Sequence, residues 1–127
     1  MPIPFKLQSG QRLADNDALN VGLATPQWQN SPAITALAGG GLSASTPLLV
    51  NGVNYLSAVA SANDSVVLPS AVAGTLVFVK NGVATNARVY CQTTDTVDGT
   101  TNVTLTASKS AWFVAYDNNK WISWVQA

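Results

Sequence analysis

The chain has 127 residues, of which 47% are hydrophobic and 9% are charged, and its six basic and six acidic side chains cancel. This length suits one domain with its own core. Without a clustered excess of Lys and Arg, nucleic acid is excluded as an expected partner. No apolar run reaches the roughly 18 residues of a membrane span, and the first residues lack the pattern of a secretory signal. We therefore expect neither a nucleic acid nor a membrane as partner.

The scarcity of charge favours a protein that packs against other subunits. A surface of this kind depends on Asn, Gln, Ser and Thr for solubility, so little charge has to be desolvated when another subunit covers it. Free-standing soluble domains can have the same composition. Composition alone therefore favours an assembly component and leaves an independent domain as the alternative.

Residues 1–47 are predicted to form an extended N-terminal arm and a joint. They hold five of the six prolines, which interrupt regular strand pairing. We expect residues 1–33 to order against a neighbouring subunit and Gly39-Gly40-Gly41 to act as a flexible joint. Trp28 stands in a polar segment next to proline and is a candidate anchor in a partner's pocket. The expected partner-contact residues of this arm are Ile3, Pro4, Phe5, Leu13, Leu19 and Trp28.

The sequence pattern of residues 48–127 predicts an all-β body. Short apolar runs are separated by turn residues at intervals of roughly 8–12 residues, as in an antiparallel sandwich or barrel. Asn51-Gly52 and Asn81-Gly82 each predict a hairpin, Pro69 ends a short strand, and DNNK at 117–120 predicts a turn. The expected fold is a single antiparallel β-sandwich or jelly-roll-like body with an extended N-terminal arm.

The last two predicted strands, 111–116 and 120–125, are apolar on both faces. Successive side chains of a strand point to opposite sides, and neither side here is polar. The outer side must therefore be covered, either by another part of the chain or by another subunit. We expect a homo-oligomer, with a trimer favoured and a dimer as the alternative. The oligomer-interface candidates are Trp112, Val114, Tyr116, Trp121 and Trp124.

The residues that most enzymes use are missing. The chain contains no histidine and no glutamate, which removes the usual general base, the common zinc ligand and the usual glycosidase pair. Ser108-Lys109-Ser110 could suggest a Ser–Lys dyad, but a lysine in a turn between strands stays solvated and protonated. We therefore expect no enzyme activity and no cofactor.

Two further groups of residues have ordinary and functional interpretations. Asp95 and Asp98 could hold calcium, or they could bond their own turn backbone, and the sequence leaves this open. Cys91, the single cysteine, is predicted to be a buried small hydrophobe. Trp112, Trp121 and Trp124 could stack on sugars, but core or subunit contact explains them more simply.

A resemblance extends over about half the chain, from Asn63 onward. The segments DSVVLP, AGTLVFVKNG, ARVY and DTVDGTTNVTLTASKSAWFVAYDNNKW resemble a module of tailed-bacteriophage virion proteins, with Val97 in place of its usual isoleucine. The resemblance implies a compact β-sandwich or jelly roll. This module occurs in capsid decoration (cement) proteins and in fibre or tail proteins.

The resemblance implies a structural virion protein, and the chain lacks the long repetitive shaft of a fibre. We expect a decoration protein, made in the bacterial cytoplasm, on the outer surface of an icosahedral phage head. It would clamp neighbouring major capsid subunits and stabilise the mature shell. The alternative is a tail-fibre or receptor-binding head domain that recognises host surface glycan. Symmetry axis and copy number stay open.

Overall fold

The computed structural model describes residues 28–127, and this part of the chain is all β, without a helix. The expected fold class is confirmed at this level. The strands are β1 (Gln29–Thr35), β2 (Gly52–Ala58), β3 (Ser65–Val67), β4 (Leu76–Asn81), β5 (Ala87–Tyr90), β6 (Thr96–Val97), β7 (Asn102–Leu105), β8 (Ser110–Asp117) and β9 (Lys120–Val125).

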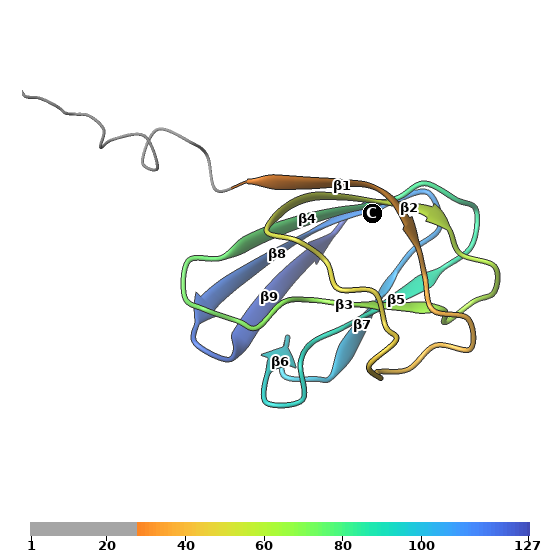
Figure 1. Cartoon of the computed structure of the whole chain (residues 1–127). Coiled ribbons are helices and arrows are strands. Elements are labelled where there is room, and N and C mark those ends of the chain that lie inside the picture. Colours follow the sequence, from red (N-terminus) through yellow and green to blue (C-terminus); the bar gives the residue numbers. More distant parts are fainter. Residues whose placement is uncertain (1–27) are drawn as a thin grey trace, which may run out of the picture.

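The strands form two sheets, which lie one above the other in Figure 1. Sheet A has six strands in the order β1-β2-β4-β8-β9-β6, and sheet B has three in the order β3-β5-β7. Between β2 and β8 the chain passes from one sheet to the other after every strand. Each sheet is therefore assembled from strands that are distant in sequence.

Both sheets are built partly from parallel pairs, so the expected antiparallel arrangement is wrong. β1 and β2, β2 and β4, β3 and β5, and β6 and β9 pair in parallel, whereas β4–β8, β5–β7 and β8–β9 are antiparallel. The chain from β2 to β5 thus winds as a coil, in the manner of a β-solenoid. Parallel neighbours require such a return through the other layer.

The coil has a regular length. Side chains of Asn54, Asn81 and Gln92 donate to the carbonyl oxygens of Phe78, Leu105 and Leu68, and each pair is 24 residues apart in sequence. These bonds join residues in successive turns of the coil. A spacing of about one coil therefore recurs along the described residues.

The two Asn-Gly pairs form corners of the coil, and the predicted hairpins are wrong. Gly52 begins β2, while Asn81 ends β4 and is followed by a strand of the other sheet. Asn81 is fully buried, and its side chain bonds Thr85 O at 2.8 Å and Val83 N at 3.2 Å. The side chain fixes the bend that a hairpin turn would otherwise make. The turn predicted at 117–120 is confirmed, as the link between β8 and β9.

The expected boundary after residue 47 is also wrong, because residues 29–47 belong to the body. β1 is the terminal strand of sheet A, and Ile34 and Ala36 are buried in the core. Pro32 lies within the pairing irregularity between Ser31 and Ile34. Prolines are tolerated in edge strands and at bulges, so this proline does not exclude a strand.

The glycine triplet is a fixed turn and not a flexible joint. Gly39, Gly40 and Gly41 all have positive φ values of 85°, 72° and 87°. The N–H of Gly39 donates to the Asp64 carboxylate at 3.1 Å. A Cβ on Gly40 would fall on the carbonyl oxygen of Asn63. Only glycine fits both the backbone conformation and this close approach.

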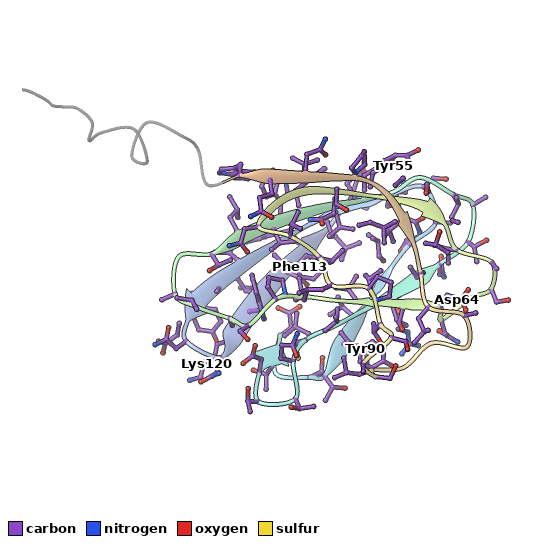
Figure 2. All side chains as sticks on the ribbon, viewed as in Figure 1. Tyr55, Asp64, Tyr90, Phe113 and Lys120 are labelled. Atoms are coloured by element: carbon purple, nitrogen blue, oxygen red, sulfur yellow. The ribbon has the colours of Figure 1, made fainter. Side chains whose placement is uncertain are left out.

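The core fills the space between the sheets. Figure 2 shows Phe113 between the two layers, and Phe113 and Trp121 are the largest of its fully buried side chains. Strand β4 buries alternate residues, with Val77 and Val79 facing inward. Cys91 is buried in the same cluster, as predicted.

A buried carboxylate joins three turns of the coil. Asp95 is 4% exposed, and its Oδ2 accepts from the N–H of Ala71 at 2.9 Å while its Oδ1 accepts from the Asn119 side chain at 2.7 Å. Each of these two partners is 24 residues away in sequence. Asp95 therefore connects the loop before β4 and the β8–β9 turn.

We predict that Asp95→Ala lowers the free energy of unfolding by about 2–3 kcal/mol, since a buried donor left without a partner costs about 1–3 kcal/mol. Urea unfolding measures the difference. Asp117→Ala is the matched control, because this exposed carboxylate accepts from the N–H of the adjacent Asn118. Equal losses in the two variants would contradict a special role of Asp95.

Candidate interaction face

The outer face of sheet A is apolar, and the alternation of its strands explains why. In β8, Ala111, Phe113 and Ala115 are buried, so Trp112 and Val114 must point away from the core. Strands β2, β4 and β9 alternate in the same way. Figure 2 shows Tyr55 of β2 on the side of sheet A that faces away from sheet B.

Strand register aligns these outward side chains in rows. Val53, Phe78, Trp112 and Trp124 are successive pairing partners across β2, β4, β8 and β9. Directly opposite side chains on one face of a sheet are in contact distance. The ring centroids of Phe78 and Trp112 are 4.8 Å apart, and Trp28 meets Trp112 edge-on at 6.2 Å. A second row, Leu76, Val114 and Ile122, runs beside the first.

We call this surface the aromatic face. It carries seven of the ten large hydrophobic side chains that are exposed among residues 28–127. Its five most exposed rings are between 40% and 62% accessible, which amounts to on the order of 500 Å² of ring surface. The seven residues are Trp28, Val53, Tyr55, Trp112, Tyr116, Ile122 and Trp124.

An apolar surface of this size indicates a binding surface. The largest apolar patch on a typical monomer is about 300–600 Å², and the aliphatic residues add further area to the rings here. The two central rows contain no charged side chain, and charged residues are depleted in the centres of protein interfaces. The face therefore has the composition of an interface centre.

Trp124 stands between two hollows. One hollow, of about 430 Å³, is lined by Val114, Tyr116 and Ile122 together with the turn at 98–99. The other, of about 350 Å³, is lined by Phe78, Trp112 and the residues after Trp124. The ring of Trp124 is 59% exposed and forms the ridge that separates them. The aromatic face is therefore not flat but has a projection with a hollow on each side.

Four of the five predicted interface residues lie on this face, and Trp121 does not. Trp121 is 1% exposed and points into the core from the inner side of β9. Its expected role in an interface is therefore wrong, because it and Trp124 are on opposite faces of one strand. Val53, Tyr55 and Phe78 also lie on this face and were not predicted from the sequence. Their alternation in GVNYL and LVFVK could have identified them.

Of the predicted arm contacts, the structure places Trp28 alone. Its ring packs on Trp112 at the margin of the aromatic face. The other candidates, Ile3, Pro4, Phe5, Leu13 and Leu19, lie outside the described residues.

The two aspartates considered for calcium bind protein donors. Asp98 accepts from the backbone N–H of Ser123 at 3.0 Å and from the hydroxyl of the same residue. Asp95 is occupied by Ala71 and Asn119. Within residues 28–127 no three His, Cys, Asp or Glu side chains form a group that could hold a metal ion. These contacts favour the turn-chemistry interpretation.

The remaining chemistry of the described residues is modest. Burial raises the pKa of the Cys91 thiol, and the nearby Asp95 carboxylate raises it further, so the reactive thiolate is disfavoured. The hydroxyl of Ser108 contacts the carbonyl of Val83 at 3.5 Å. The described part of the chain offers no helix long and apolar enough to cross a membrane.

The comparisons with known proteins return no relative. No family model, no curated protein and no solved structure matches the chain.

The two tryptophans of β9 provide a direct test of the faces. Trp121→Ala should lower the free energy of unfolding by about 3–5 kcal/mol, because it leaves a cavity in the core. Trp124→Ala should change it by less than about 1 kcal/mol, because the ring is exposed. Denaturant unfolding of dilute protein measures both. A similar cost at the two positions would contradict the assigned orientation of β9.

Proposed function

We propose that this protein is a capsid decoration (cement) protein of a tailed bacteriophage. It binds the outside of the icosahedral head, clamps neighbouring major capsid subunits and stabilises the mature shell. The observation that carries the proposal is the aromatic face, a large apolar surface without charge in its central rows. The virion-module resemblance of residues 63–121 supports the same class.

Coverage of such a face by a protein partner is favourable in the working state of the molecule. Its rows are held by main-chain pairing of four adjacent strands, so little ordering is needed when a partner covers them. The aromatic rings provide the large buried contacts that dominate interface energies. An assembly component uses such a surface permanently.

Within this proposal the body is a compact sandwich-like clamp wound from coils of about 24 residues. The segment before β1 would act as the arm on shell subunits, adding main-chain hydrogen bonds and apolar anchors. Many copies repeated by the symmetry of the head would give high avidity from individually weak contacts. Preferential binding to the mature shell would stabilise that state.

The proposal predicts a phenotype of the particle. Phage particles made without this protein should lack external density at symmetry-related positions of the head and should release DNA at a lower temperature. Cryo-electron microscopy and a heat-release assay on particles with and without the protein provide the measurements. Density confined to the tail would overturn the proposal.

The arm can be tested separately. Deletion of residues 2–27 removes no described strand, so the body should keep its far-ultraviolet circular dichroism spectrum. Its binding to heads that lack the protein should fall at least about tenfold, since the arm contacts are lost. Co-sedimentation with such heads measures the binding. Unchanged affinity for these heads would refute the proposed role of the arm.

A second candidate function is a tail-fibre or receptor-binding head domain that recognises host glycan. The exposed Trp124 ring beside an apolar hollow favours it, because sugars stack on exposed aromatic rings. Glycan-array binding that disappears in Trp124→Ser, by a protein without affinity for heads, would establish this alternative.

A further inference from the structure

Trp124 and the hollow beside it are complementary in shape. The ring is the most exposed indole of the described residues, and Trp112 by contrast contacts both Phe78 and Trp28. The neighbouring hollow has a volume of about 430 Å³ and is open to solvent, so a side chain from outside can enter it. A protruding ring and a cavity that can receive one thus adjoin on the aromatic face.

They are also complementary in chemistry. A buried tryptophan needs an apolar environment for its ring and one acceptor for its indole N–H. The hollow is lined by apolar side chains and one carboxylate residue, namely Val114, Tyr116, Ile122, Trp124 itself and Asp98. Asp98 already accepts two hydrogen bonds from Ser123, and a carboxylate has capacity for about four. The hollow therefore offers what an incoming indole requires.

The position of ring and hollow on one face decides the symmetry. In a twofold contact the same patch meets itself, so a projection and its receptor must lie on the same surface. In a ring of three they would lie on two different surfaces. The central rows of the face also carry no like charges that would repel a second copy.

We infer that the aromatic face binds a second copy of this chain about a twofold axis, with Trp124 of each copy seated in the hollow formed by β8, β9 and the 98–99 turn of the other. The exposed ring surface on the order of 500 Å², with the aliphatic rows, approaches the roughly 800 Å² per partner of a standard interface. The inference rests on the proposed function for taking this face as an assembly surface. It replaces the expected trimer with a twofold pair.

Sedimentation velocity of the full chain, without capsids, tests the pair. The unaltered protein should be a dimer at tens of micromolar or below, while Trp124→Ser should dimerise at least about 30-fold more weakly, as expected for a hot-spot residue. Leu48→Ser is the matched control. Leu48 is 58% exposed, a fraction similar to the 59% of Trp124, but it pairs with Val67 of sheet B and lies away from the aromatic face. It should leave the dimer unchanged.

A mixing experiment separates ring insertion from a generally adhesive face. Trp124→Ser removes the projection and leaves Val114, Tyr116 and Ile122 of the hollow in place, whereas Ile122→Lys keeps the projection and blocks the hollow. Each variant alone should be largely monomeric. The equimolar mixture should regain one of the two insertions and form a heterodimer about tenfold more tightly than either variant alone. Both positions are exposed, so the variants should fold.

Several outcomes would overturn the inference. These are a monomeric protein at about 100 µM, a trimer, a Leu48→Ser effect as large as that of Trp124→Ser, or a mixture that regains no dimer. Saturable binding of glycan at Trp124 by a monomer would assign the face to the second candidate function. A monomer that still binds heads refutes the pair and leaves the proposed function standing. A dimer without affinity for heads supports the twofold pair and refutes the proposed function.

Discussion

The return of the chain to the same sheet after about 24 residues is the constraint on which the rest of the structure depends. A parallel pair cannot be closed by a tight turn, so every corner has backbone polar groups that need other partners. Buried side chains supply them: Asn54 and Asn81 bond carbonyls of the next turn, and Asp95 bonds both Ala71 and Asn119. Because these bonds fix the length of the coil, they also fix the register of sheet A.

The register in turn creates the candidate site. Once Val77, Phe113 and Trp121 face the core, the intervening residues of β4, β8 and β9 must face outward. Their apolar character then forms rows across the sheet and cannot be dispersed over the surface. The aromatic face is therefore a direct result of the same pairing that closes the core, combined with strands that are apolar on both sides.

Local sequence patterns predicted the local structure, but they could not predict which strands pair with each other. The all-β class, the turn at 117–120 and the buried Cys91 follow from alternation and turn residues. The parallel order does not, because Asn-Gly favours a bend without specifying which strand comes next to it. Pro32 led to the wrong prediction of an arm in place of β1, because a bulge in an edge strand tolerates a proline. Trp121 shows why the candidate site could not be predicted completely. The sequence shows that β9 is apolar on both faces, but only the fold shows which of the two faces is buried.

Pro32 also bears on how this molecule avoids the wrong kind of association. A parallel coil ends in a strand whose free edge could template a further strand, and repeated addition of that kind leads to fibrils. β1 occupies that position in sheet A, and its proline and pairing irregularity break the run of hydrogen-bonding groups along it. Growth by strand addition at this edge of sheet A is thereby disfavoured.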